Sequence, residues 1–240
     1  MFGESVYQRP QQGSRFSCII AGLFSLALML LTHNAMASDP WERANRRLYQ
    51  FNDFFDTLII RPVAVVYSNL MPSIMQQGVG NFFSNIDDVK VTLNDLLQFK
   101  LEDAASDSAR VVLNTTVGVV GLIDVATPIG LEKNDEDFGQ TFGAWGVPAG
   151  PYIIIPTVGS STLRDAVGWA LGLAFNPFFY GESSVSVPAY ALEQTSTRAN
   201  LLAFDELVFG DEYIFVREAY LQRREYLVKD GEIEDEFGDF

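Results

Sequence analysis

Residues 141–180 read TFGAWGVPAGPYIIIPTVGSSTLRDAVGWALGLAFNPFFY, and this stretch holds the clearest strand signal of the chain beside a very apolar helical segment. Two apolar segments, residues 141–147 and 152–155, flank the turn sequence Pro148-Ala149-Gly150-Pro151. This order is typical of two short strands joined by a turn. We therefore predict a β-hairpin over Phe142–Ile155, which Pro156 ends.

The second half of the stretch predicts a short apolar helix. Gly159-Ser160-Ser161 precedes a helix that begins near Thr162, and either serine can cap its N-terminus. The segment from Ala166 to Tyr180 holds one evident polar side chain, Asn176. A helix of this length is too short to cross a bilayer, which takes about 20 residues, but it suits one membrane leaflet or a buried core.

Helical periodicity dominates the segments on either side of this stretch. Apolar side chains recur at helical spacing from Trp41 to Leu58, and Arg61-Pro62 should end that helix because proline lacks a donor and restricts the residue before it. The expected fold is mainly α, with one short β-hairpin. Further helices are predicted at Val63–Leu70, within Ile74–Phe99, from Glu102 to Arg110, at Pro188–Phe209 and at Asp211–Lys229.

Residues 1–37 predict a secretory signal peptide. Two arginines precede the short apolar run Ile19–Leu31, and the small-x-small sequence Ala35-Met36-Ala37 follows it. This order is typical of a leader that is cut between Ala37 and Ser38. An uncleaved anchor is the weaker alternative, because the apolar run is short.

Charge and composition exclude several classes of function. The chain has 16 basic and 31 acidic residues, a net charge of −15, which argues against binding nucleic acid and against charge-driven docking on anionic lipid. Cleavage of the leader removes Glu4, Arg9 and Arg15 and changes the net charge from −15 to −16. It also removes Cys18 and His33, the chain's one Cys and one His. Disulfides, Cys/His zinc sites and histidine catalysis are then excluded in the mature chain.

The remaining polar motifs do not predict a catalytic, metal or cofactor site. Ser160 and Ser161 do not lie in a nucleophile elbow. The acidic run 135–137 could bind a cation through oxygens, but it lacks the EF-hand spacing, and a solvated loop is favoured. The adjacent Arg164 and Asp165 could form either a buried or a surface pair, and the sequence leaves both open.

An ordered set of short motifs across residues 39–228 resembles the MlaA (VacJ) family of outer-membrane proteins. Each motif is weak alone, but the whole set in order is specific. The motifs are NRRLYQFN at 45–52, RPVA at 61–64, NF at 81–82, NT at 114–115, GLIDVA at 121–126, FGQT at 138–141, GV at 146–147, GPY at 150–152, Pro156, GS at 159–160, TLRD at 162–165, RA at 198–199, Tyr213, REAY at 217–220 and QR at 222–223.

The resemblance implies phospholipid transport without catalysis. Family members are ring-like helical proteins in the outer membrane, where an amphipathic channel takes mislocalised phospholipids from the outer leaflet and passes them to a periplasmic lipid-binding protein. The ring associates with trimeric porins, and a hairpin beside the channel is thought to control it. In this chain the implied gate residues are Phe142, Gly143, Trp145, Gly146, Pro148, Gly150, Pro151, Tyr152 and Ile154, and the implied membrane-embedded helix residues are Trp169, Leu171, Leu173, Phe175, Phe178 and Phe179.

The chain departs from the family at its membrane anchor. Many members are acylated on the first mature Cys, and this sequence has no Cys after its predicted leader. We expect a leader at 1–37, a lipid-channel domain at 38–229 held in the membrane by apolar helices, and a solvated acidic tail at 230–240. The alternatives are a non-catalytic scaffold that holds porins and, less favoured, a lipid hydrolase.

Overall fold

The computed structural model of the protein describes residues 39–207 and 210–232. The predicted signal peptide, its cleavage site at Ala37 and Ser38, the last residues of the predicted helix 188–209 and most of the predicted acidic tail lie outside the described residues.

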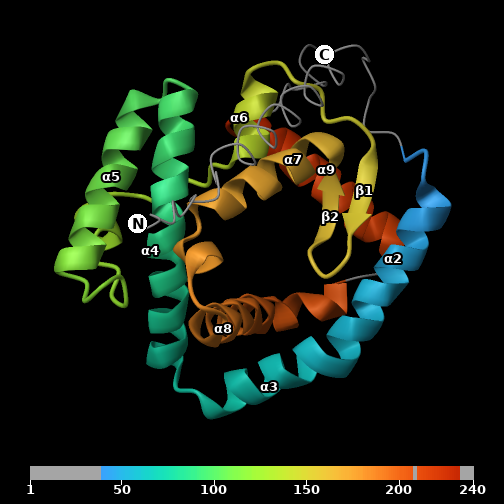
Figure 1. The fold of residues 1–240 in the computed structure, drawn as a ribbon, viewed down its shortest axis with the longest axis horizontal. Helices are drawn as coiled ribbons and strands as arrows, with labels where there is room; N and C mark the ends of the chain where they lie inside the picture. Colours follow the sequence, from blue (N-terminus) through green and yellow to red (C-terminus); the bar gives the residue numbers. More distant parts are fainter. Residues whose placement is uncertain (1–38, 208–209, 233–240) are drawn as a thin grey trace, which may run out of the picture.

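The helices are arranged as a ring (Figure 1). One side is formed by α2, η1 and α3, the opposite side by α4 with α5 packed outside it, and a third side by α6, α7 and α9. The chain is thus mainly helical, as expected. The bounds of these elements are α2 Glu42–Phe55, η1 Asp56–Ile60, α3 Arg61–Leu70, α4 Ser73–Leu97, α5 Leu101–Thr116, α6 Phe138–Ala144, α7 Leu163–Gly172 and α9 Glu212–Val228.

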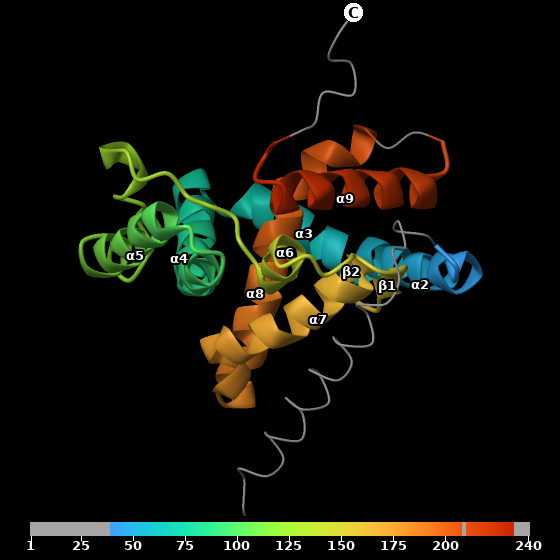
Figure 2. The same ribbon diagram turned by 90° about the horizontal axis from the view of Figure 1, so that it is seen from above.

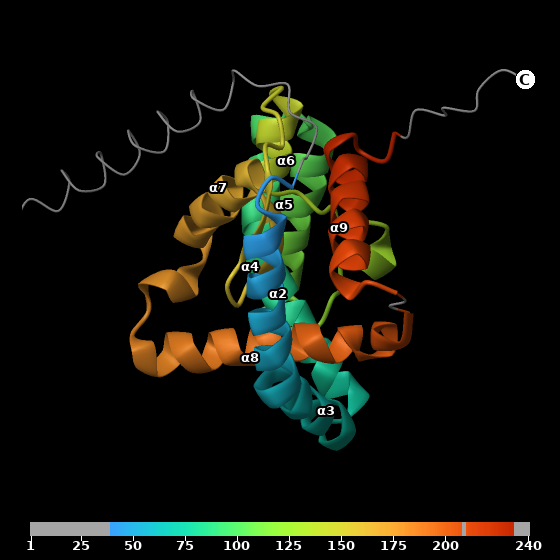
Figure 3. The same cartoon turned by 90° about the vertical axis from the view of Figure 1, so that its right-hand side faces the viewer.

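The remaining helix, α8 (Ser183–Leu201), runs roughly along the short axis of the ring, as Figure 3 shows. Viewed from above, α9 lies on one face of the layer formed by α2 to α5, and α7 lies on the other (Figure 2). The helix α8 therefore extends from the face of α7 toward the face of α9. Short 3₁₀ segments complete the description, namely η2 Thr127–Ile129, η3 Leu173–Phe175, η4 Pro177–Tyr180 and η5 Leu202–Leu207.

The predicted helix end at Arg61-Pro62 is wrong, because the chain stays helical through Pro62. A π-helical turn, η1, precedes the proline, and the backbone N–H of Arg61 donates to the carbonyl oxygen of Asp56 across this wider turn. The proline lies in the first turn of α3, where its missing donor and fixed φ are tolerated. The helical path ends later, where Met71 is extended and Pro72 precedes α4.

The β-hairpin exists, but its predicted bounds were wrong. Strand β1 (Tyr152–Ile155) pairs antiparallel with β2 (Gly159–Thr162), with Tyr152 opposite Thr162 and Ile155 opposite Gly159. The segment predicted as the first strand begins in α6 instead. The Asp137 carboxylate starts that helix by accepting from the N–H of Gln140, and a helix N-cap of this kind outweighs local strand propensity.

The predicted cap and length of the apolar helix also need correction. Ser160 and Ser161 lie in β2, and the side chain of Thr162 caps α7 by accepting from the N–H of Asp165. The α-helix ends at Gly172, and two 3₁₀ segments carry the chain to Tyr180. Asn176 separates these segments because its side chain accepts from the N–H of Phe178 and starts the second one.

A buried polar layer joins α4 to α5. Asp95 and Asp107 are both fully buried, and neither oxygen of the Asp95 carboxylate has a hydrogen-bond partner among the described residues. Burial and the neighbouring carboxylate of Asp107 together raise the pKa of Asp95 to about 7. A proton held by Asp95 would supply the missing donor between the two carboxyl groups.

We expect the stability of the protein to fall as the pH rises through the titration of Asp95. An unfolded Asp loses its proton near pH 4, so from about pH 4 to 7 the folded chain keeps a proton that the unfolded chain has lost. The free energy of unfolding therefore decreases across this window, and Asp95→Asn should raise the melting temperature more at pH 8 than at pH 4. Thermal melts at both pH values measure this, and an equal change at both would contradict it.

The crossing of α6 and α7 depends on two facing glycines. A Cβ at Gly168 would lie 2.3 Å from the backbone nitrogen of Gly139, so Gly168→Ala forces the helices apart. We expect a loss of about 1–3 kcal/mol in the free energy of unfolding. The matched control is Gly80→Ala in α4, where a Cβ would meet nothing within 4 Å. This substitution should stabilise the helix by up to about 1 kcal/mol, because alanine has the higher helix propensity. Equal effects of the two changes in denaturant titrations would refute this account.

Candidate functional site: a central cavity and its hairpin

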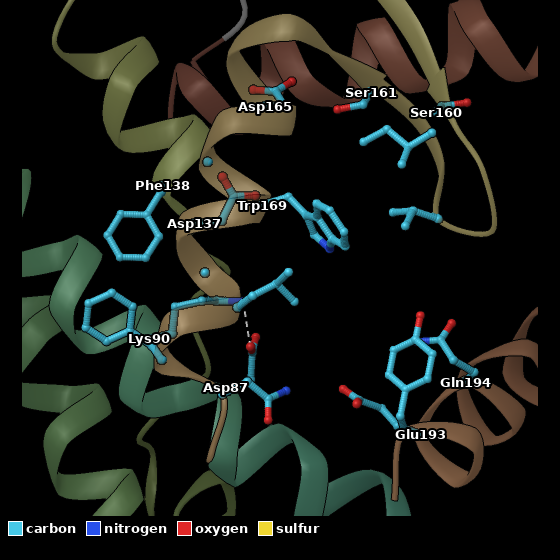
Figure 4. A pocket seen from close by; sticks show the side chains of 18 of the residues that line it. Asp87, Lys90, Asp137, Phe138, Ser160, Ser161, Asp165, Trp169, Glu193 and Gln194 are labelled. Carbon is cyan, nitrogen blue, oxygen red and sulfur yellow. Dashed lines mark ion pairs between the residues drawn. The ribbon is translucent and has the colours of Figure 1, made fainter. Parts of the chain in front are cut away.

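A cavity of about 410 Å³ lies between α4, α6, the hairpin, α7, α8 and α9 (Figure 4). Its walls combine large apolar side chains with several charged ones. The lining residues are Ile86, Asp87, Lys90, Asp137, Phe138, Ile155, Val158, Ser160, Ser161, Asp165, Gly168, Trp169, Gly172, Leu173, Phe175, Asn176, Tyr190, Glu193, Gln194, Tyr220 and Arg224.

The apolar part of the wall comes chiefly from α6, α7 and η3. The rings of Phe138 and Phe175 lie 5.2 Å apart, and Trp169 and Leu173 line the same cavity. Trp169 and Phe175 are exposed because the cavity leaves their rings uncovered by protein. This side of the cavity offers an apolar surface.

An ion cluster around Arg224 ties α9 to α6 and α7 beside the cavity. The guanidinium donates to Asp137 at 2.6 and 3.0 Å and to Asp165 at 3.1 and 3.0 Å. Burial alone would lower the pKa of Arg224, but its hydrogen bonds to Asp137 and the charges of Asp137 and Asp165 together outweigh this and raise it. The same contacts hold the pKa of Asp137 below its usual value, against the effect of burial. Asp137 therefore stays ionised.

Asp165 has two further partners that complete the cluster. The Tyr220 hydroxyl donates to it at 2.8 Å, and Arg164 lies 2.8 Å from its other oxygen. Arg164 and Asp165 thus form a buried pair, which decides the alternative that the sequence leaves open. The cluster has as many guanidinium groups as carboxylates, so its charges are matched within the protein.

The acidic run 135–137 is a set of structural ion pairs, and the favoured interpretation as a solvated loop is wrong for two of its three residues. Glu136 is buried against the Lys100 ammonium at 2.6 Å, and Asp137 belongs to the Arg224 cluster. Only Asp135 is largely exposed, where it pairs with Arg223. Across residues 39–207 and 210–232, no group of acidic residues is arranged to hold a metal ion.

Two asparagines of α2 form hydrogen bonds with the backbone groups along the outer edge of the hairpin. Asn45 donates to the carbonyl oxygen of Tyr152 at 3.0 Å and accepts from the N–H of Ile154 at 3.0 Å. About two helical turns along, Asn52 donates to Ile155 and accepts from the N–H of Thr157 at 2.8 Å. The two amides replace a third strand, so the hairpin is fixed to α2 along β1 while its other side lines the cavity.

The aromatic contacts of β1 hold the base of the hairpin more firmly than its tip. Tyr152 is fully buried and packs against Tyr213 and Tyr220 of α9, with ring centroids 6.2 Å apart in each pair. By contrast, Thr157 and Val158 in the turn are exposed, and Thr157 has a φ of 64°. The Asn52 amide is therefore the main polar attachment of the tip.

Asn52→Ala should loosen the hairpin tip without unfolding the ring. Loss of both hydrogen bonds should cost about 1–2 kcal/mol and speed hydrogen exchange at the Thr157 amide. Hydrogen exchange followed by mass spectrometry measures this. The control is Asn81→Ala in α4, which removes one hydrogen bond to Leu122 far from the hairpin. Unchanged exchange in residues 152–162 of the Asn52 variant would contradict the anchoring role.

The structure places the predicted gate residues in several different elements. Only Tyr152 and Ile154 lie in the hairpin, and both are buried in β1. Phe142 and Gly143 lie in α6, Trp145 follows its end, and Gly146, Pro148, Gly150 and Pro151 lie in the connection to β1. Of the cavity-lining residues in the hairpin, sequence reasoning included Ile155 in the predicted hairpin but missed Val158, Ser160 and Ser161. The turn residues Pro156-Thr157 and the flexible Gly159 could have indicated this second turn.

The predicted membrane-facing residues divide between two surroundings. Trp169, Leu173 and Phe175 line the cavity. Phe178 packs between Phe82 and Phe83 of α4, Leu171 is half-buried and Phe179 is exposed. The segment therefore contributes to the cavity wall as well as to the outer surface.

Many other large apolar side chains are exposed along α2, η1, α3 and the start of α4. They form an apolar rim, which consists of Phe51, Phe54, Leu58, Ile59, Val63, Val65, Val66, Leu70, Ile74 and Met75. Exposed apolar surface of this extent marks an interaction site for protein or lipid. None of the described helices is both long and apolar enough to cross a bilayer.

Comparison with known proteins gives consistent matches over most of the chain. A family model described as "MlaA lipoprotein" matches residues 37–227. The "Intermembrane phospholipid transport system lipoprotein MlaA" of Escherichia coli (strain K12) is 38% identical over 202 residues, which cover 82% of this chain and 80% of that protein. The protein with the same name from Haemophilus influenzae is 30% identical over 203 residues, 82% of this chain and 81% of that protein.

A solved structure has the same fold. It is described as "Structural basis for maintenance of bacterial outer membrane lipid asymmetry", and it superposes with a TM-score of 0.72 at 36% sequence identity. The match covers 80% of this chain and 99% of that one.

Proposed function

Because the chain belongs to the MlaA family, we propose that it removes mislocalised phospholipids from the outer leaflet of the outer membrane and passes them to a periplasmic lipid-binding protein. The proposal includes no catalytic step. It extends to this chain the phospholipid transport that its relatives' names describe.

One observation carries the proposal, namely the cavity whose walls are part apolar and part charged. A phospholipid needs apolar surface for its acyl chains and polar groups for its headgroup. Phe138, Trp169 and Leu173 supply the first kind of surface, and Asp87 and Lys90 supply the second. Moving a lipid through such a space breaks no covalent bond, so it needs neither a nucleophile nor a metal.

The apolar rim supports residence in the membrane. Side chains such as Val63, Val66 and Leu70 on α3 would contact acyl chains, since burial of apolar surface away from water is favourable by about 25 cal/mol per Å². A ring held this way would lie in the membrane with its short axis across the lipid layer. The same rim could receive a trimeric porin.

Membrane attachment should not require acylation in this protein. Its relatives are named lipoproteins, whereas its Cys18 precedes the apolar run of the predicted leader. We expect protein purified from membranes to have the intact mass of the unmodified chain that begins at Ser38, and to resist extraction by high salt. An adduct of diacylglyceryl mass, or full recovery in the soluble periplasm, would overturn this. The Escherichia coli relative serves as the acylated reference.

The gate of the transport path is proposed to be the hairpin Tyr152–Thr162. Its β1 edge is attached to α2, and its turn and β2 contribute Val158, Ser160 and Ser161 to the cavity wall. Movement of the tip would change the width of the cavity with little change to the ring. Its two polar attachments at Asn52 can be exchanged for water at small cost.

A disulfide between Asn52→Cys and Thr157→Cys tests the gate. In a Cys18→Ser background, the oxidised variant should lose most phospholipid transfer from vesicles to a periplasmic acceptor, and reduction should restore it. Thr157→Cys alone, treated with the same oxidant, is the control. Equal transfer by the oxidised and reduced forms, with unchanged circular dichroism, would refute a moving hairpin.

A porin-associated scaffold is the second candidate, and the apolar rim favours it. The two functions differ in what the purified protein carries. Phospholipid that co-purifies in the cavity, and that is lost when Trp169 is replaced by Glu, supports transport. A protein that binds porin but never phospholipid would be a scaffold.

A further inference from the structure

The charges that line the cavity fall into a matched group and an open group. Arg224 and Arg164 are already used by Asp137 and Asp165. The charged lining residues outside that cluster are Asp87, Lys90 and Glu193, which face the lower part of the cavity in Figure 4. Two carboxylates and one ammonium leave this open group with a net charge of about −1 at neutral pH.

Lys90 is held so that its ammonium reaches the cavity. Its stem lies against α7, where a Cβ at Gly172 would be 3.5 Å from the Lys90 Cδ atom. The ammonium forms an ion pair with Asp87, with 2.6 Å between Nζ and Oδ1. Both side chains are partly exposed, so this pair is weak and can open for a ligand.

Glu193 lies across the cavity on α8, and its carboxylate forms no hydrogen bond or ion pair with the described part of the chain. Figure 4 shows its carboxylate directed toward Asp87 and Lys90. Burial raises the pKa of Glu193, Asp87 raises it further, and Lys90 acts in the opposite direction. A half-buried carboxylate without a partner gains most from a cation that enters the cavity.

We propose that Lys90, Asp87 and Glu193 form a binding site for a zwitterionic phospholipid headgroup, in which Lys90 binds the phosphate while Asp87 and Glu193 bind the ammonium. This proposal rests on the proposed function, since the cavity must admit phospholipid. The apolar wall of Phe138, Leu173 and Phe175 lies beside the site for the start of the acyl chains.

Charge favours this headgroup over an anionic one. A zwitterionic headgroup brings one negative and one positive charge, and each meets an opposite charge in the open group. Phosphatidylglycerol brings a phosphate but no ammonium, so it would take Lys90 from Asp87 and leave two carboxylates uncompensated. The preference therefore comes as much from the uncompensated carboxylates that phosphatidylglycerol would leave as from attraction of the ammonium.

The experiment compares binding of phosphatidylethanolamine and phosphatidylglycerol, each labelled on an acyl chain, to the full-length protein purified in detergent. The parent should bind phosphatidylethanolamine about three- to fivefold more tightly. Glu193→Gln should abolish this preference and keep the binding of phosphatidylglycerol, whereas Lys90→Gln should weaken the binding of both lipids. Glu102→Gln, an exposed carboxylate on α5, is the matched control and should leave the preference unchanged.

The outcomes separate the two proposals. Equal affinities of the parent for both lipids, or an unchanged preference in Glu193→Gln, would overturn the headgroup site and leave transport standing. No binding of either lipid by the folded parent would overturn both. Circular dichroism of each variant shows that a lost preference does not come from unfolding.

Discussion

The hydrogen-bonded ions Asp137, Arg224 and Asp165 hold the ring closed at its upper side. Asp137 starts α6, Asp165 lies in the first turn of α7, and Arg224 belongs to α9, so one guanidinium joins three helices. Gly139 makes the approach possible, since a Cβ there would lie 2.6 Å from the Asp165 carboxylate. Removing one of these side chains leaves the others charged and without a partner, which lowers the stability more than loss of a surface ion pair does. The cavity wall beneath depends on this closure.

The interior between the helices is rich in buried polar side chains, and many large apolar side chains lie on the surface instead. In most soluble proteins the apolar residues fill the core. Here buried polar side chains such as Asp88, Asn94 and Asp107 connect the helices, while the valines and Leu70 of α3 face outward. This arrangement agrees with the proposed residence in a membrane and with the proposed binding of a charged headgroup in the central cavity. Under the proposed function, the rim would determine where the protein resides and the cavity would determine what it accepts.

Sequence alone predicted the helical class and most helix positions, because 3.6-residue periodicity survives wherever one face is buried. It failed where a side chain from a distant segment decided the local structure. Residues 142–144 are helical because Asp137 caps them and Thr141 bonds to Asn94 of α4, and no window around them contains that partner. Similarly, β1 was found, but its partner strand was not, since Gly159–Thr162 has little strand propensity and pairs through its backbone. The cavity charges come from α4, α7, α8, α9 and the start of α6, and they could not be grouped without coordinates.

The π turn before Pro62 has a further consequence for how the chain tolerates changes in length. One extra residue in a helix rotates everything beyond it by about 100° around the axis. The π turn takes up about one such extra residue, so deletion of one residue from Asp56–Ile60 would let the turn relax to regular α geometry and leave the buried Ala64 and Tyr67 facing inward. A residue deleted from the regular part of α3, by contrast, would rotate the residues beyond it, because there residue count sets which face of the helix is buried.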